Sequence, residues 1–309
     1  MNIPPKPRIQ FYRARTFSEK MSVTFDFLRE NLKPLLKYTL YVTLPLCLIQ
    51  SFLMDSFMRV YTAGVLEGQL SNLASAAVPY VLLLLCTMLG SVLLSALAYS
   101  LLQTYERRDR RLEGLVFADF RALFEVNILK ALRIVLFVFG MVVAAVAVIA
   151  VLGWMALWTL AITFPLLLVA TVAVMVPFAL FTPLYLFEDL PFATALRKAL
   201  KYGFSAWGET FLVVLVFGLL ANILSGVTSL PWTLISIVGS VFSQLSPDAP
   251  VTSFLWYQSL TYLLGVVMAC GTYVSLIISV TGTAFQYFHL REKREDVTVK
   301  TDIANFDSL

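Results

Sequence analysis

The chain has 309 residues, of which 59% are hydrophobic and only 14% are charged. Soluble domains carry roughly a quarter charged residues, so this composition excludes an ordinary soluble domain and favours an integral membrane protein. The net charge of +4 says little as a total. The three cysteines lie in apolar segments without CxxC spacing, which favours buried small hydrophobes over disulfides or a metal site.

Six apolar segments are long enough to cross a bilayer, which takes about 20 helical residues. In chain order they cover residues 35–53, 78–102, 134–152, 159–187, 210–230 and 257–288. The fourth contains Pro165, Pro177 and Pro183, which predict kinks because each proline removes a backbone donor. A further apolar segment, 231–245, has about 15 residues and suits an interfacial helix or a re-entrant segment better than a crossing, which stays open.

Lysine and arginine gather in alternate connecting segments. Eight precede the first span, seven lie between the second and third, three lie between the fourth and fifth, and four follow the sixth. With six spans, 22 of the 23 basic residues fall on one side of the membrane, and only Arg59 falls on the other. The positive-inside rule therefore predicts a multi-pass protein with both termini in the cytoplasm.

Each odd-numbered span follows a segment with an apolar stripe at helical spacing. The stripes are Phe17, Met21, Phe25, Leu28 and Leu32; then Phe117, Phe120, Phe124 and Ile128; then Phe192, Ala195, Leu196, Ala199, Leu200 and Gly203. Such helices lie in the membrane interface. The predicted fold is therefore all-α: a polytopic membrane protein with six transmembrane helices in three pairs, each pair preceded by an amphipathic interfacial helix.

The recurring pattern divides the single membrane domain, 1–309, into three repeat-like units. They cover residues 14–104, 105–187 and 188–290, and a polar C-terminal tail covers 291–309. Recurrence of one pattern indicates an architecture built by repetition. The alternative is that any helix at the inner surface is amphipathic, without a true repeat.

The segment 185–220, YLFEDLPFATALRKALKYGFSAWGETFLVVLVFGLL, resembles the signature of the glycerophosphoryl diester phosphodiesterase membrane-domain family. The matching positions are Glu188, Ala195, Leu196, Lys198, Trp207 and Gly208. The opening TFSEKMSVTFDFLRENLKPLL and the ending QYFHLREKRE are similar to stand-alone members from Bacteroidetes-type bacteria. The resemblance implies a membrane module of the bacterial inner membrane. We expect no phosphodiesterase activity, because the charged segments are too short for that family's separate soluble catalytic domain.

The predicted spans contain almost no ionisable side chains. Asp, Glu, Lys, Arg and His are absent from 78–102, 134–187, 210–245 and 257–288. Intramembrane ionisable residues mark catalytic centres and ion pathways, so we expect no enzyme, no cofactor and no metal. The only histidine, His289, is expected to be a solvated or capping group. An intramembrane enzyme is the weakest alternative, and it would have to use polar side chains such as Gln50, Asn222, Gln258 and Gln286.

Two residue sets are candidate contact sites. Basic residues beside the inner surface are candidate anionic-lipid contacts: Arg107, Arg108, Arg110, Arg111, Arg197, Lys198 and Lys201. The run at 107–111 has the alternative of setting topology without a ligand. Small side chains in the sixth span form a candidate helix-packing stripe, within the chain or toward another subunit: Gly271, Ser275, Ser279 and Thr283.

The leading functional hypothesis is a non-enzymatic scaffold, or a subunit of a membrane complex, with a basic cytoplasmic surface facing lipid. Its expected partners are membrane lipids and other integral membrane proteins, and not nucleic acid. The alternative is a transporter or lipid-handling channel for uncharged or amphipathic molecules. The prolines of the fourth span and the open status of 231–245 motivate that alternative.

Overall fold

The computed structural model describes residues 8–67, 75–108, 111–155, 157–245 and 251–299. The helices are α1 (Phe17–Glu30), α2 (Leu32–Glu67), α4 (Ala77–Arg107), α5 (Phe117–Met155), α6 (Leu157–Ala179), α7 (Phe181–Phe187), α8 (Phe192–Ser205), α9 (Trp207–Leu245) and α10 (Leu255–Glu295), with a short 3-10 turn at Val251–Ser253. No strand occurs among these described residues.

Six segments of the described chain are long and apolar enough to cross a bilayer. They are Leu32–Tyr61, Ala77–Arg107, Phe117–Val151, Phe164–Phe187, Trp207–Phe242 and Leu255–Glu295. The prediction of an all-α polytopic membrane protein with six spans is therefore confirmed.

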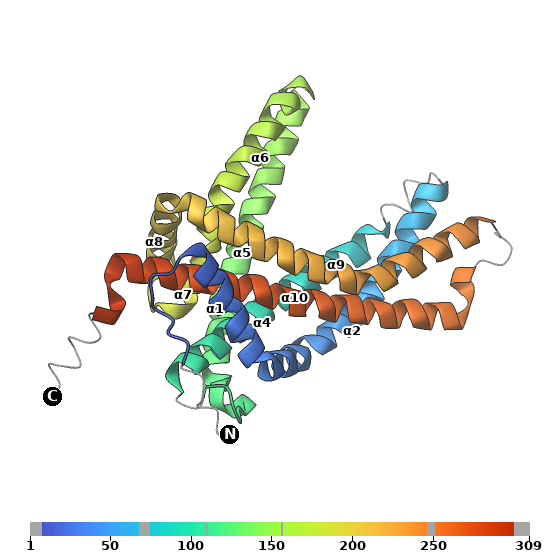
Figure 1. The fold of residues 1–309 in the computed structure, drawn as a ribbon. Helices are drawn as coiled ribbons and strands as arrows, with labels where there is room; N and C mark the ends of the chain where they lie inside the picture. Colours follow the sequence, from blue (N-terminus) through green and yellow to red (C-terminus); the bar gives the residue numbers. More distant parts are fainter. Residues whose placement is uncertain (1–7, 68–74, 109–110, 156, 246–250, 300–309) are drawn as a thin grey trace.

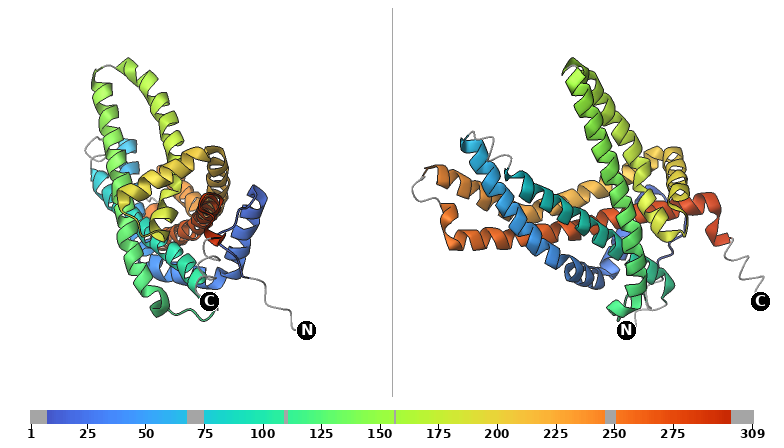
Figure 2. Two further views of the ribbon diagram at one scale, coloured as in Figure 1. Left: turned by 90° about the vertical axis from the view of Figure 1, so that its left-hand side faces the viewer. Right: turned by 180° about the vertical axis from the view of Figure 1, so that it is seen from behind.

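The spans form two parts that diverge from one end of the molecule (Figures 1 and 2). One part is an elongated body of α2, α4, α9 and α10, in which α10 packs against the other three. The other part is the α5–α6 hairpin, which runs in a different direction. We call the region where the two parts meet the basic end; it comprises α1, α7, α8 and the adjoining ends of α4, α5 and α10.

The densest core lies at the basic end rather than in the middle of the spans. Residues 281–290 of α10 are all buried. Phe11, in the segment before α1, stacks on Phe288 at a centroid distance of 4.8 Å and on Tyr105 of α4 at 5.5 Å. The N-terminal segment thus closes over the ends of α4 and α10, and aromatic packing holds it there.

The fourth span breaks where its prolines predict a kink. Helix α6 ends at Ala179, and α7 begins at Phe181. Pro183 has no N–H to donate to the carbonyl of Ala179, which interrupts the helical hydrogen bonds at the point where α6 gives way to α7. Pro165 and Pro177 lie inside α6, which continues past both of them.

Residues 231–245 do not form a separate helix or a turn back. They continue α9, which runs for 39 residues with Pro231 inside it. At 1.5 Å per residue this helix is about 59 Å long, well beyond the ~30 Å hydrocarbon layer. The Tyr257 hydroxyl of α10 donates to the carbonyl of Ile235 at 2.9 Å. Packing on α10, which is of similar length, therefore supports this segment as a helix. A prediction based on the length of the segment alone misses this support.

Two of the three predicted amphipathic segments are separate helices. Helices α1 and α8 have 14 residues each and precede α2 and α9. The middle segment instead forms the first turns of α5, and its Phe120 is fully buried against Tyr38 of α2, with ring centroids 5.0 Å apart. Its apolar stripe therefore packs inside the protein, and the segment is not a separate interfacial helix.

The predicted polar tail does not begin at residue 291. Helix α10 continues to Glu295, and Arg291 is half-buried among other side chains. Residues 300–309 lie outside the described chain. The last turns of α10 therefore belong to the folded basic end.

Candidate functional site

Four charged side chains from α8, α10 and the end of α7 form an ion-pair cluster, which we call the Glu188 cluster. The Nζ atom of Lys198 lies 2.6 Å from carboxylate oxygens of both Glu188 and Glu295. The Nε atom of Arg291 lies 3.5 Å from Glu188 and 3.2 Å from Glu295. Glu188 is only 8% exposed, and the Tyr287 hydroxyl donates to it at 2.8 Å. These contacts join α7, α8 and α10.

Tyr12, from the N-terminal segment, also joins this cluster. Its hydroxyl accepts a hydrogen bond from Arg291 at 3.0 Å. Burial raises the pKa of Tyr12 to about 12, so its hydroxyl stays protonated at neutral pH. The segment before α1 is therefore tied to the end of α10 by a polar contact as well as by Phe11.

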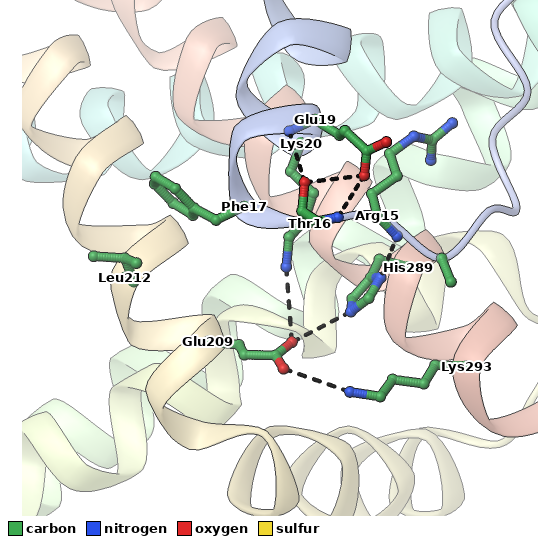
Figure 3. A pocket seen from close by; sticks show the side chains of 10 residues that line it. Arg15, Thr16, Phe17, Glu19, Lys20, Glu209, Leu212, His289 and Lys293 are labelled. Atoms are coloured by element: carbon green, nitrogen blue, oxygen red, sulfur yellow. Dashed lines mark hydrogen bonds and ion pairs between the residues drawn. The ribbon is translucent and has the colours of Figure 1, made fainter.

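A polar pocket of 460 Å³ opens between the first turns of α1 and α9, on the end of α10 (Figure 3). Glu209 of α9 lies at its centre, 3.7 Å from Lys20 Nζ and 3.2 Å from His289 Nε2. Its other carboxylate oxygen lies 3.5 Å from Lys293 Nζ. One carboxylate therefore faces three basic side chains from two helices.

Lys20 is the most deeply buried of these basic groups, at 2% exposure. Its ammonium group donates to the Gln286 side chain at 2.8 Å, and Gln286 donates to the Thr210 hydroxyl at 3.2 Å. Burial lowers the pKa of Lys20, and the nearby Glu209 carboxylate opposes that effect. A lysine is rarely buried without such partners.

His289 is not the solvated or capping group that the sequence predicts. It is 5% exposed, because the N-terminal segment folds over the end of α10. The backbone N–H of Arg15 donates to Nδ1 at 2.9 Å, which leaves the ring proton on Nε2 to bond Glu209. Both ring nitrogens are engaged, so the arrangement positions groups rather than offering a free base.

The described residues offer no metal site, since none of their His, Cys, Asp and Glu side chains form a group of three suited to an ion. The polar side chains weighed for an intramembrane enzyme have separate partners. Gln50 donates to the Tyr273 hydroxyl at 2.8 Å, Asn222 to a carbonyl of its own helix, and Gln258 to the Thr252 carbonyl at 3.1 Å. The structure does not bring them to one place.

Six of the seven basic residues considered for lipid contact fall into two groups. Three form ion pairs with carboxylates of other segments: Arg108, Arg111 and Lys198. Three are exposed at the surface: Arg107, Arg197 and Lys201. Arg110 lies outside the described residues. The paired residues join helix ends, a structural use that their sequence positions alone do not indicate.

The small-residue stripe of the sixth span begins in the interface between α9 and α10. A Cβ atom on Gly271 would lie 2.2 Å from Thr228 Oγ1 of α9. Ser275 is 1% exposed, Thr283 is 9% exposed, and Ser279 is half-buried. At Gly271, the absent side chain is what allows the two helices to approach closely.

Among the six spans of the described chain, the one in α5 has the smallest share of buried side chains. In the most apolar part of α5, 6% of residues are buried, against 33% in both α4 and α10. Gly140 and Ala144 are exposed on this helix, and no heavy atom lies within 4 Å of the position of a Cβ on Gly140. A Gly-xxx-small motif permits close helix approach, and no described helix of this chain uses it here. This motif was not among the sites predicted from the sequence.

No protein-family model, curated protein or solved structure matches this chain. The resemblance to the glycerophosphoryl diester phosphodiesterase membrane-domain family therefore stays a prediction.

Proposed function

We propose that the chain is a non-enzymatic subunit or scaffold of a membrane complex and that its α5–α6 hairpin binds another membrane helix. The observation that carries the proposal is the open Gly140–Ala144 motif on α5, whose most apolar part has few buried side chains. Helix association in lipid depends on close packing rather than on the hydrophobic effect.

The hairpin is attached firmly enough at its base to present such a surface. Phe137 of α5 packs edge-to-face on Phe192 of α8, with ring centroids 5.3 Å apart. The indole of Trp207 donates to the Ala173 carbonyl of α6 at 3.1 Å. The base is therefore fixed by α8 and α9, and the exposed motif begins at Gly140, three residues after Phe137.

A Gly140→Leu substitution tests this function. No atom of the chain lies within 4 Å of the position of the added Cβ, so the fold should be unaffected. A partner helix, however, could no longer approach closely. In native membranes, we expect the amount of partner protein cross-linked to the full-length chain to fall several-fold. The amount that co-purifies with the chain should fall in the same way. A second copy of the chain counts as a partner.

Gly218→Leu in α9 is the matched control, because no atom lies within 4 Å of the position that a Cβ on Gly218 would occupy. This substitution should leave the amount of co-purified partner unchanged. The proposal fails if the wild-type chain is monomeric without a partner in native membranes, or if the two substitutions reduce the yield equally. Equal melting temperatures of both variants show that folding is not the cause.

We also propose that the basic end faces the cytoplasm and that the membrane is a bacterial inner membrane. The distribution of 22 of the 23 basic residues supports this orientation. Labelling of single cysteines with a membrane-impermeant reagent tests it, and labelling of the basic end from outside the cell would refute it. The transporter or lipid-handling alternative stays a prediction, which flux measurements in liposomes can decide.

A further inference from the structure

A pocket of 220 Å³ lies between α2, α4 and α10 in the elongated body. Its lining includes uncharged polar side chains from all three helices: Gln50, Ser51, Thr87, Ser91, Thr272 and Tyr273. These residues lie inside segments long and apolar enough to cross the membrane. None of the lining residues is charged. Since a charge inside the bilayer needs a partner, this pocket suits an uncharged molecule.

The pocket is accessible from the side of the protein that faces lipid. Two of its lining residues, Thr87 and Leu276, are exposed on the spans α4 and α10. Other lining residues are apolar and include Met54, Leu83 and Met268. A molecule dissolved in the bilayer can therefore enter the pocket directly from the membrane.

Gln50 and Tyr273 bring hydrogen-bonding groups to this pocket from α2 and α10. Gln50 Nε2 donates to the Tyr273 hydroxyl at 2.8 Å and to the Thr87 hydroxyl at 3.4 Å. The Thr87 hydroxyl donates in turn to the Leu83 carbonyl at 2.8 Å. Gln50 is only 7% exposed and Tyr273 only 4% exposed. Both polar side chains are therefore held within the protein at membrane depth.

This arrangement leaves one donor over. The Tyr273 hydroxyl accepts from Gln50, and no group among the described residues accepts its own proton. A buried donor without an acceptor is costly, and most of all inside a bilayer, where water is scarce. The pocket therefore favours a ligand that presents a hydrogen-bond acceptor, such as a carbonyl oxygen, to Tyr273.

The size of the pocket limits the ligand to about one substituted ring. An apolar cavity of about 150 Å³ in a protein holds benzene. The pocket between α2, α4 and α10 is larger, at 220 Å³. A six-membered ring that carries small substituents therefore fits.

We propose that this pocket binds the ring of an uncharged carbonyl compound dissolved in the membrane, the chemical class to which quinones belong. A ring carbonyl accepts the proton of Tyr273, and the ring packs on the apolar side chains of α2, α4 and α10. The absence of charge, the spare donor and the size of the pocket all favour this occupant. The site lies outside the α5–α6 hairpin, so this proposal does not depend on a partner helix at Gly140.

Thermal unfolding of the full-length protein in detergent tests the proposal, because a ligand that binds only the folded state raises the melting temperature. The probe is duroquinone, a tetramethyl ring with two carbonyl groups. Its matched control is durene, which has the same ring and methyl groups without the carbonyl oxygens. Duroquinone should raise the melting temperature more than durene at the same concentration.

Tyr273→Phe removes the spare donor and keeps the aromatic ring. This variant should require about three- to tenfold more duroquinone for the same rise, as expected for the loss of one hydrogen bond, and should respond to durene as the wild type does. Tyr262→Phe is the control on the same helix. Its hydroxyl donates to the Leu48 carbonyl, and Tyr262 is not part of the pocket lining, so the requirement should change by less than about twofold.

The space in the pocket is tested by a second pair of variants. Ala269→Leu fills the pocket and should reduce the rise caused by duroquinone, whereas Val267→Leu changes an exposed residue of α10 outside the lining and should not. Each rise is measured from the variant's own melting temperature without ligand. The proposal is overturned if duroquinone gives no rise, if durene acts equally, if Tyr273→Phe leaves the requirement unchanged, or if Ala269→Leu has no effect.

Discussion

Glu188 illustrates how a single buried charge can organise a helix junction. It follows α7 directly and contacts Lys198, Tyr287 and Arg291 from two other helices. In the sequence, only the family resemblance singles out Glu188. Its partners come from positions up to 103 residues away, at Arg291, so no local pattern could identify them.

Glu188→Gln should destabilise the protein. The substitution removes a negative charge shared by Lys198 and Arg291, and removing one member of a buried ion pair costs about 3–5 kcal/mol. Because Glu295 still pairs with both cations, we expect about 1–3 kcal/mol in the free energy of unfolding. Chemical denaturation in detergent, followed by circular dichroism, measures it.

Asp189→Asn is the control for that substitution. Asp189 pairs with Lys130 at 3.0 Å, but its side chain is 99% exposed. Exposed ion pairs contribute little, so the change should stay within about 0.5 kcal/mol. Equal stability of the two variants would show that the Glu188 cluster does not hold the helix ends together.

Lys20 and His289 show where residue-level sequence reasoning ends. The capping box of α1 and the helix itself are readable from the sequence, because Thr16 and Glu19 have the required spacing. The burial of Lys20 is not, since it depends on Gln286 lying across from it. Lys20 lies on the face of α1 that carries Thr24 and Phe27, to one side of the predicted apolar stripe. This position was the only signal in the sequence that Lys20 packs on protein.

Among the helices, α8 has a very close approach to a neighbour at Gly203. A Cβ on Gly203 would lie 2.3 Å from the Cα of Pro177 in α6, and Ala195 and Ala199 on the same helix are fully buried. The small residues of the predicted stripe thus serve close packing of α8 on the end of the hairpin. The stripe predicts an apolar face correctly but does not distinguish lipid from protein.

Gly203→Ala should separate α8 from α6. The contact is with backbone, which cannot rotate away, and such overpacking costs about 1–3 kcal/mol. Gly208→Ala in α9 is the control, because nothing lies within 4 Å of its Cβ position; it should be neutral or stabilising by up to about 1 kcal/mol. Unfolding free energies in detergent compare the two, and a wild-type value for Gly203→Ala would contradict the close contact.

The boundaries of helices could be predicted from the sequence where a local feature determines them. The break between α6 and α7 follows from Pro183, and α1 and α8 follow from amphipathic spacing. The continuity of α9 through 231–245 and of α5 through its first turns depends on contacts with α10 and α2. Such contacts join residues that lie far apart in the sequence, so they leave no periodic signal in it.

For the whole molecule, composition and the alternation of basic residues predict six spans and one charged end. The divergence of the α5–α6 hairpin from the other spans was not predicted (Figure 1). In the spans, side chains that pack on protein and side chains that face lipid are both apolar. Hydropathy therefore cannot report which spans pack together. This divergence is what leaves Gly140 open to a partner.

The proposed topology depends most on the basic end lying on the cytoplasmic side of six crossings. Single cysteines at Glu113 and Asp189, both exposed at the basic end, and at Leu255, exposed at the start of α10, test this after replacement of Cys47, Cys86 and Cys270. In intact spheroplasts, an impermeant maleimide should label position 255 and spare 113 and 189; inverted vesicles should reverse the pattern. Labelling of 113 or 189 in intact spheroplasts would contradict this topology.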